Sequence, residues 1–171
     1  VGNKYTPPVE IDSNVTHVSA GYNHSLFIKN DGSLWETGYT PLGNQQTGYI
    51  YIPAKVIDTG VIHAEAENWR SHIIKSDGSL WGKGKQGFGE LGVGNQTSYS
   101  GYKKSVDSGV TGVAAGGSHT LFSKTDGSIW AMGYNVNGQL GWWSGYTDPQ
   151  YTPVQSNQAG IEMGTAPTST S

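Results

Sequence analysis

The sequence predicts an all-β fold made of β-propeller blades, and three observations support that prediction. The motif Asp-Gly-Ser-Leu-Trp occurs at 31–35 and 77–81, and Asp-Gly-Ser-Ile-Trp occurs at 126–130. The motifs begin 46 and 49 residues apart, close to the repeat length of four-stranded propeller blades. Glycine accounts for 26 of the 171 residues and charged residues for only 13%, which is typical of short strands joined by tight turns.

The composition excludes several other classes of protein. Aromatic residues make up 11% of the chain, whereas disordered chains are rich in charge and poor in aromatics. No apolar run approaches the roughly 18 residues of a membrane helix, so membrane insertion is not expected. Ten basic and 13 acidic residues give a net charge of −3 without a run of either sign, so no nucleic-acid partner is expected. The absence of cysteine excludes disulfides and cysteine-based zinc sites.

The first two strands of each repeat follow from the alignment around the motif. The first strand is expected at 15–21, 61–67 and 110–116, and the second at 24–29, 70–75 and 119–124. Leu26-Phe27-Ile28 and Ile73-Ile74 are apolar without alternation, which predicts that both faces of the second strand are covered.

The third strand follows a tight turn, and the fourth closes the repeat. Asp-Gly between two apolar runs is a strong hairpin signal, because glycine accepts positive φ and aspartate tolerates it. The recurring Trp35, Trp81 and Trp130 begin the third strand and are expected in equivalent buried positions. A Gly-x-Leu-Gly segment follows at 87–92 and 137–141, with a shortened form at 41–43, and a closing segment such as 53–58 ends the unit.

These elements divide the chain into three repeats with partial units at both ends. Residues 13–58, 59–107 and 108–157 are the repeats. Residues 1–12 match a closing segment and are expected to be the last strand of a preceding blade, and 158–171 begin a further unit that passes into a Thr/Ser-rich linker. Three blades are too few to close a ring, so the prediction is an incomplete or multi-chain propeller. Either further blades of a longer chain or other copies of this one would complete it.

The repeat resembles that of a known family. Val-Ala-Ala-Gly-Gly-Ser-His-Thr-Leu, then Asp-Gly-Ser-Ile-Trp-Ala-Met-Gly-Tyr-Asn and Gly-Gln-Leu-Gly, is similar to the repeat of the regulator of chromosome condensation family, in its bacterial rather than its eukaryotic form. The resemblance spans about residues 5–157 and implies a propeller, commonly of seven blades, that acts as a rigid platform for binding other proteins. The second repeat departs from the pattern, because Glu67 replaces Gly21 and Gly116, and Arg70 replaces His24 and His119.

No candidate for catalysis, for cofactor binding or for metal binding emerges from the polar residues. His24 and His119 share one repeat position, and His17 and His63 share another, so structural roles such as a loop-bracing hydrogen bond are expected. His72 replaces a leucine of the second strand, either as a core histidine or facing the channel. Glu65 and Glu67 share a strand face, as paired catalytic carboxylates can, but Arg70 offers Glu67 an ion pair.

The aromatic residues that differ between repeats are the candidate protein-contact residues. Such residues in Gly- and Ser-rich loops are typical of contact surfaces, because Tyr and Trp supply large contact area at low entropic cost. Tyr22 and Trp69 are placed in the turn where the third repeat has Gly117. The other candidates lie in the inter-strand loops and insertions: Tyr39, Phe88, Tyr134, Tyr49, Tyr51, Tyr99, Tyr102, Trp142, Trp143 and Tyr146. Packing beneath long loops is the alternative for some of them.

These observations favour a non-enzymatic protein-interaction or structural module in a bacterial surface or secreted assembly. Its expected partners are other copies of the chain, further blades, or a surface or secreted protein. One alternative is an inhibitor that binds a secreted enzyme through aromatic-rich loops. A third hypothesis, implied only by the eukaryotic branch of the family, is guanine-nucleotide exchange on a small GTPase.

Overall fold

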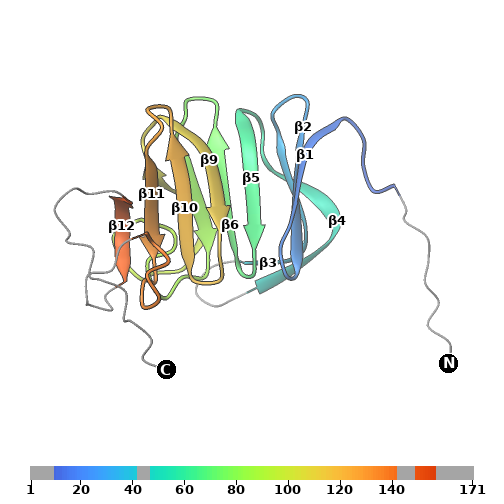
Figure 1. Ribbon diagram of the computed structural model, residues 1–171. Helices are drawn as coiled ribbons and strands as arrows, with labels where there is room; N and C mark the ends of the chain where they lie inside the picture. Colours follow the sequence, from blue (N-terminus) through green and yellow to red (C-terminus); the bar gives the residue numbers. More distant parts are fainter. Residues whose placement is uncertain (1–9, 42–46, 142–148, 157–171) are drawn as a thin grey trace, which may run out of the picture.

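The fold consists of three four-stranded antiparallel sheets that stand side by side (Figure 1). The computed structural model describes residues 10–41, 47–141 and 149–156, and these contain strands and turns but no helix. No helix in these ranges could therefore span a membrane. The first sheet, blade 1, contains β1 (Val15–Ala20), β2 (His24–Lys29), β3 (Leu34–Pro41) and β4 (Thr47–Ile57).

Blades 2 and 3 repeat this order. Blade 2 contains β5 (Val61–Glu67), β6 (Arg70–Lys75), β7 (Leu80–Gly84) and β8 (Tyr99–Val106). Blade 3 contains β9 (Val110–Ala115), β10 (His119–Lys124), β11 (Ile129–Gly133) and β12 (Gln150–Gln155). The prediction of four-stranded antiparallel blades is confirmed. Of the predicted closing strand at 1–12, residues 10–12 lie in no strand and the rest lie outside the described residues.

The hydrophobic core lies between the blades, in two joints. Each blade has a rear face toward the preceding blade and a front face toward the following one. The joint between blades 1 and 2 buries Leu26, Ile28, Leu34, Val61, Ala64, Ala66 and Ile73. The joint between blades 2 and 3 buries Ile74, Leu80, Val110, Val113, Phe122 and Met132. Ile73 and Ile74 point into different joints, so both faces of this strand are covered, as its unbroken apolar run predicts.

The Asp-Gly-Ser motif forms the same hydrogen-bonded turn in every blade. In blade 2, Asp77 Oδ1 accepts hydrogen bonds from the Ser79 amide at 2.9 Å and from the Ser79 hydroxyl. Trp81 Nε1 donates to Ser79 Oγ at 2.7 Å. Gly78 has a φ of 76°, a conformation that costs glycine little. The carbonyl of Gly78 accepts a hydrogen bond from the Val110 amide at 2.9 Å, so the turn also fixes the start of the next blade.

The three recurring tryptophans occupy equivalent positions, but the expectation that they are buried is wrong. Trp35, Trp81 and Trp130 are each half-buried. A lysine ammonium covers one face of each ring, with Nζ 4.2 Å from the ring centroid in blade 1 and 4.3 Å in blades 2 and 3. The cationic ends of these lysines keep contact with water, so Trp81 and Trp130 lie at the edges of the two joints rather than inside them.

Candidate protein-interaction site

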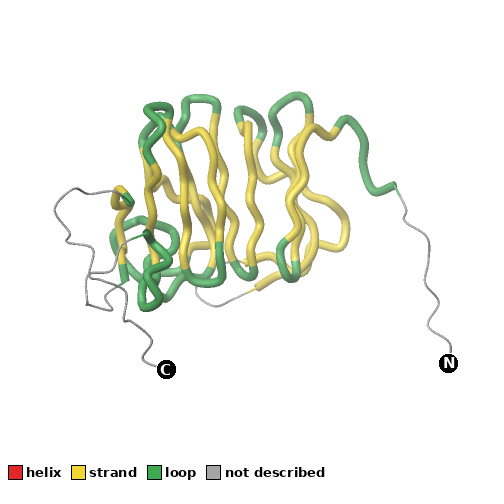
Figure 2. The backbone as a smooth tube through the Cα atoms, in the orientation of Figure 1, coloured by secondary structure: helices red, strands yellow, loops and turns green. Residues whose placement is uncertain are grey.

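Two kinds of loop meet at one rim of the blades. The strands run between two rims of loops (Figure 2). The turn between the first and second strands of each blade and the end of its third strand lie at the same rim. The amide of Tyr39 donates to the Asn23 carbonyl at 2.7 Å, and the amide of Tyr134 donates to the Ser118 carbonyl at 2.8 Å. The glycine before each of these residues is required, because a Cβ at Gly38 or Gly133 would collide with the backbone of the facing turn. We call this surface the loop rim.

The loop rim carries an aromatic cluster that bridges blades 1 and 2. The ring of Tyr39 lies 4.6 Å from Tyr49 and 5.5 Å from Trp69, measured between centroids. Tyr51 stacks on Tyr49 at 5.5 Å. Tyr49 is 66% exposed and Tyr51 is 84% exposed, so this cluster presents a large apolar surface to solvent. Tyr39, Tyr49, Tyr51 and Trp69 are hereafter the aromatic cluster.

A second aromatic contact bridges blades 2 and 3 at the same rim. Phe88, from the β7–β8 loop, lies 4.7 Å from Tyr134, which follows β11. Phe88 is 39% exposed. Tyr22 is 75% exposed in the β1–β2 turn and takes part in neither contact. The structure therefore brings six of the predicted contact residues into two groups on one rim and leaves Tyr22 apart.

The remaining predicted contact residues divide into three cases. Tyr99 is half-buried on β8, where its hydroxyl accepts a hydrogen bond from Asn95 Nδ2 at 3.0 Å. Tyr102 points into the joint between blades 1 and 2 rather than out of a surface loop, and its hydroxyl oxygen is buried. Trp142, Trp143 and Tyr146 lie outside the described residues.

The placement of Trp69 opposite Gly117 is wrong by one residue. The carbonyl of Trp69 accepts the Lys85 amide at 2.9 Å, just as the carbonyls of Asn23 and Ser118 accept their facing amides. Trp69 therefore corresponds to Asn23 and Ser118, whereas Asn68 corresponds to Tyr22 and Gly117. The Asn68 position has positive φ (25°), which asparagine tolerates better than most residues.

The joint between blades 1 and 2 contains a buried polar network. Lys83 Nζ lies 2.6 Å from Glu36 Oε2, and these side chains are 7% and 1% exposed. His24 Nε2 lies 2.9 Å from Ser71 Oγ. Burial, together with the nearby Lys83 charge, lowers the pKa of His24 to about 4. Burial and the charge of Glu36 raise the pKa of Tyr102 well above its usual value, an effect that the nearby Ser71 hydroxyl partly offsets.

The contact between His24 and Ser71 has the spacing of a nucleophile and its base, but its surroundings do not suit catalysis. Ser71 is fully buried and His24 is 3% exposed, so a substrate could not reach them. His24 Nδ1 has no hydrogen-bond partner among the described residues, whereas a catalytic histidine is oriented by a third group. The bond instead ties β2 to β6 across the joint, in agreement with the structural role predicted for His24.

The joint between blades 2 and 3 is held by Arg70, which replaces the histidine of the other repeats. Its guanidinium pairs with Glu67 and Glu90 and donates to the carbonyls of Gly116 at 2.9 Å and Gly117 at 2.8 Å. The Glu67–Arg70 ion pair that the sequence suggests is therefore present. In the other repeats, a Cβ at Gly21 would lie 3.0 Å from the His24 ring, so glycine and histidine belong together, and Glu and Arg replace them as a pair.

His72 and His17 have structural contacts as well. His72 is fully buried on β6, and its Nε2 lies 3.2 Å from the Glu90 carbonyl, so it is a core histidine. Burial and the Arg70 charge lower the pKa of His72 to about 3. The rings of His17 and His63 lie 4.6 Å apart on neighbouring blades, and His17 Nε2 contacts the Ala64 carbonyl at 2.8 Å. Within the described ranges, no three potential ligands of a metal ion come together.

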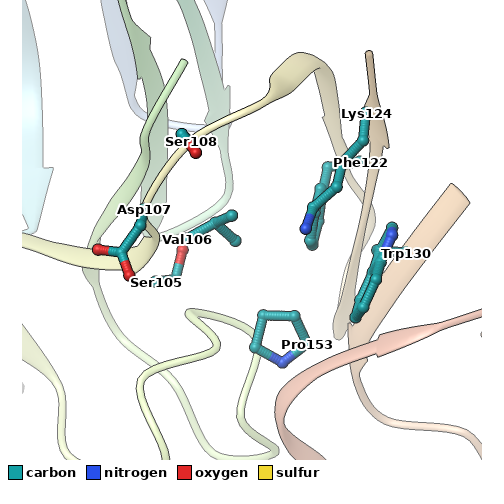
Figure 3. Close-up of a pocket in the computed structure, with 8 residues that line it drawn as sticks. All are labelled: Ser105, Val106, Asp107, Ser108, Phe122, Lys124, Trp130 and Pro153. Carbon is teal, nitrogen blue, oxygen red and sulfur yellow. The ribbon is translucent and has the colours of Figure 1, made fainter. Parts of the chain in front are cut away.

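Two grooves open between the blades near their outer strands. The groove at the joint of blades 2 and 3, about 370 Å³, lies between Trp130 and Phe122 on one side and Val106 and Asp107 on the other, with Pro153 below (Figure 3). The groove at the joint of blades 1 and 2, about 440 Å³, is bordered by the equivalent Trp81. Because both grooves occupy the same place in the repeat, they follow from blade packing.

Comparisons with known proteins find a repeat similar to parts of this chain and solved structures with a similar fold. The model of the regulator of chromosome condensation (RCC1) repeat matches residues 15–39 and 110–139. The solved structure of Prp20p from Saccharomyces cerevisiae shares 18% identity and a TM-score of 0.71, over 84% of this chain and 38% of that one. Human WBSCR16 shares 20% identity and a TM-score of 0.69, over 88% of this chain and 39% of that one. Yeast RCC1 (Prp20) bound to Kap60 shares 17% identity and a TM-score of 0.73, over 90% of this chain and 40% of that one.

These comparisons fix the fold but not a specific function. The chain spans about two fifths of the length of the solved structures it matches, and their identities are too low to carry more than the fold. No curated protein matches the sequence. The ranges that match the repeat model lie in the first three strands of blades 1 and 3. These two blades have glycine and histidine at the positions where blade 2 has Glu67 and Arg70. The first and third repeats are therefore similar to the regulator of chromosome condensation repeat, and the chain is folded as three consecutive blades of a β-propeller.

Proposed function

We propose that the chain is a non-enzymatic protein-interaction module that binds its partner through the loop rim, and that it works in a bacterial surface or secreted assembly. The observation that carries the proposal is the contact of Tyr39, Tyr49 and Trp69, which come from two blades. Tyr49 is exposed, and the half-buried Tyr39 and Trp69 support it from below. Clustered aromatics of this kind supply most of the binding energy in protein interfaces, because they bury a large area while losing little entropy.

The rigidity of the rim supports this role. Tyr39 and Trp69 are both attached to backbone segments that hydrogen-bond to a facing strand or turn. A partner would therefore meet a surface that is already ordered, and less conformational entropy would be lost on binding. Propellers with this fold have protein partners, since the structural neighbours include Prp20p, described by its binding to Gsp1p and histones, and yeast RCC1 bound to Kap60.

The polar residues support a binding role over catalysis. Glu65 and Glu67 lie on the front face of β5, and burial raises the pKa of both carboxyl groups. Arg70 pairs with Glu67, which accounts for that carboxylate without a reaction. The Ser71–His24 contact lies inside a joint, out of reach of a substrate.

A site-specific cross-linking experiment tests the loop rim. A photo-reactive residue at position 49 should yield a discrete adduct with a partner in an extract of the source organism, and Trp69→Ser should reduce its yield at least about tenfold. The matched control carries the photo-reactive residue at position 62, because Ile62 is 58% exposed but lies at the other end of its strand. Equal adducts from both positions would exclude the loop rim as the binding surface.

The same experiment separates the alternatives. An aromatic rim also suits an inhibitor of a secreted enzyme, in which case the adduct would contain an enzyme whose activity the chain lowers. An adduct with a small GTPase, together with faster release of its nucleotide, would instead indicate nucleotide exchange.

A further inference from the structure

We propose that the groove between blades 1 and 2 binds a small, uncharged aromatic molecule that carries a hydroxyl group, that is, a phenol. This inference goes beyond the protein-interaction role, and it uses no residue of the aromatic cluster at the loop rim. The residues that line the groove all come from blades 1 and 2, so the site is formed within one molecule.

The groove has the size and the walls of a small-molecule site. Its volume is about 440 Å³, within the roughly 300–1,000 Å³ of pockets that hold small ligands. Val56 and Ile57 of blade 1 line it, together with Trp81 and Tyr102 of blade 2. Aliphatic and aromatic walls of this kind favour a flat apolar ring.

Two residues that line the groove each have an unpaired oxygen. Glu36 Oε1 and the Tyr102 hydroxyl oxygen are both buried, and neither has a hydrogen-bond partner among the described residues. Lys83 Nζ lies 2.6 Å from the other carboxylate oxygen, and the nearby Ser71 hydroxyl already contacts His24. Burial and the charge of Glu36 raise the pKa of Tyr102, and the second effect requires that the carboxylate and the phenol group lie near each other. Buried oxygens without a partner destabilise a fold, and in our proposal a ligand supplies that partner.

The two oxygens define the group that would pair with them. A carboxylate only accepts hydrogen bonds, whereas a neutral tyrosine hydroxyl can donate one. One hydroxyl group on the ligand can therefore donate to Glu36 Oε1 and accept from Tyr102 at the same time. A sugar is disfavoured, because its further hydroxyl groups would meet the apolar walls without partners.

The charges around the groove favour an uncharged ligand. Lys83 already neutralises Glu36, so a charged ligand would lose its hydration without gaining a free counter-charge. Lys75 also lines the groove, with Nζ 4.3 Å from the centroid of the Trp81 ring, and would repel a cation. The carboxylate of Glu36 would repel an anion.

The groove between blades 2 and 3 occupies the same place in the repeat but has different chemistry (Figure 3). The three polar residues of the first groove have no counterpart with a charge or a hydrogen-bond donor: Gly82, Met132 and Pro153 stand in place of Glu36, Lys83 and Tyr102. Blade packing alone therefore does not require polar groups at these positions. Their presence in one groove only points to a ligand, and the other groove is a control within the same molecule.

An NMR titration of the isotope-labelled chain with 4-methylphenol tests the proposal. The amide signals of Gly101 and Tyr102 should shift and saturate with a dissociation constant of about 1 mM or lower, as expected for a ligand of this size. The signals of Asp107 and Ser108, in the groove between blades 2 and 3, should not move. The absence of a saturable shift, or equal shifts in both grooves, would overturn the proposal.

A matched ligand tests the role of the hydroxyl group. The compound 4-methylanisole keeps the ring but has a methyl ether in place of the O–H, so it cannot donate to Glu36. It should bind at least about tenfold more weakly, because a hydrogen bond to a charged group is lost. In the double variant Glu36→Ala/Lys83→Met, which removes both charges together, the difference between the two ligands should disappear. Equal affinities in the wild-type chain would mean that the groove takes any aromatic ring, contrary to the proposal.

The variant Tyr102→Phe tests the second oxygen, because it removes the hydroxyl and keeps the ring. It should weaken the binding of 4-methylphenol about fivefold, and urea unfolding should show no loss of stability, since the deleted oxygen has no partner in the described part of the chain. The control Tyr99→Phe removes a hydroxyl of the same strand that bonds to Asn95 outside the groove, and it should leave binding unchanged. Unchanged binding in Tyr102→Phe would contradict the proposal, as would a loss of stability, which would assign this oxygen to the fold.

Discussion

Individual side chains at the joint of blades 1 and 2 depart from the repeat pattern in a coordinated way. Glu36 and Lys83 form a buried ion pair, whereas the equivalent positions in blade 3 hold Ala131 and Met132. Buried ion pairs contribute little net stability, because removing two charges from water offsets their attraction. Glu36 Oε1 also has no hydrogen-bond partner in the described part of the chain. We therefore expect the pair to contribute to the specificity of this joint more than to its strength.

Breaking the Glu36–Lys83 pair on one side should be costly, and removing both partners should not. Lys83→Met leaves a buried carboxylate unpaired, which we expect to lower the free energy of unfolding by about 3–5 kcal/mol. The double variant Glu36→Ala/Lys83→Met carries the residues of blade 3 and should recover most of that loss. Urea unfolding of wild type, single and double variants measures these values. Additive losses in the double variant would show that the two side chains do not interact.

The buried histidines predict a loss of stability in mild acid. The pKa values of His24 and His72 are lowered to about 4 and about 3, against 6.5 in the unfolded chain. Below pH 6.5 the unfolded chain takes up protons that the folded chain does not, so the free energy of unfolding falls as the pH decreases. Each histidine should contribute a slope of up to about 1.4 kcal/mol per pH unit.

The variant His72→Leu isolates this effect, because leucine holds the position of His72 in both other repeats. The slope of unfolding free energy between pH 6.5 and pH 5 should be shallower in the variant than in the wild type, by up to about 1.4 kcal/mol per pH unit. Urea unfolding at a series of pH values gives both slopes. Equal slopes would mean that His72 is protonated in the folded protein.

The four-stranded blade owes its regularity to the turn between its second and third strands. Asp31, Asp77 and Asp126 each accept from the serine two residues later, and each serine accepts from the following indole. The hydrogen bonds of the aspartates lower the pKa of all three carboxyl groups, so the turn keeps its charge in mild acid. Because the glycine of the turn in blades 1 and 2 also bonds to the next blade, one motif sets both the hairpin and the spacing of the blades.

Loss of the serine hydroxyl should weaken a blade. Ser79→Ala removes the acceptor of Trp81 Nε1 and the donor to Asp77, in a side chain that is fully buried. We expect the free energy of unfolding to fall by about 1–3 kcal/mol, the usual cost of leaving a buried polar group unpaired. The control Ser100→Ala changes an exposed serine of the same blade and should have little effect. Thermal unfolding compares them, and equal melting temperatures would show that the turn does not need this bond.

At the scale of the whole molecule, contacts between blades follow a constant sequence offset. His17 with Ala64, His24 with Ser71 and Glu36 with Lys83 are each 47 residues apart. Arg70 is 46 and 47 residues from the two carbonyls that it binds in blade 3. Each residue thus meets the blade one repeat further along the chain, as in other arrays whose units contact only their neighbours.

This offset explains which features could be predicted from the sequence. The strands, the turn and the apolar faces recur in each repeat, so comparing the repeats with one another revealed them. The partners of Glu36 and Lys83 could not be found in that way, because the pair occurs once and joins different repeat positions. Pairing every residue with the one 47 residues ahead, one more than the repeat length of 46 between the first two repeats, would have suggested it. The shift of Trp69 by one residue was avoidable, because the alignment of Glu67 with Gly21 and of Arg70 with His24 already places Asn68 opposite Tyr22.

Arg70 should control how firmly blade 3 is attached. Arg70→Ala leaves the carbonyls of Gly116 and Gly117 without this donor, and it leaves Glu67 and Glu90 without their cation. Amide hydrogen exchange in β9–β12 should accelerate at least about tenfold, while exchange in β1–β4 changes little. The control Lys85→Ala alters an exposed side chain near the same rim. Uniform acceleration over all three blades would mean that they unfold only together.

The pairing of Gly21 with His24, replaced by Glu67 with Arg70 in blade 2, constrains the order in which such a repeat can evolve. A side chain at the glycine position meets the histidine ring, and at Gly116 the collision would be closer still. If the glycine were replaced by glutamate first, the new side chain would strain the turn. If the histidine were replaced by arginine first, the imidazole ring would be gone and the glutamate side chain would have space. We therefore expect sign epistasis between the two substitutions, with an accessible mutational path through the arginine intermediate. Ancestral repeats should accordingly include Gly with Arg but not Glu with His.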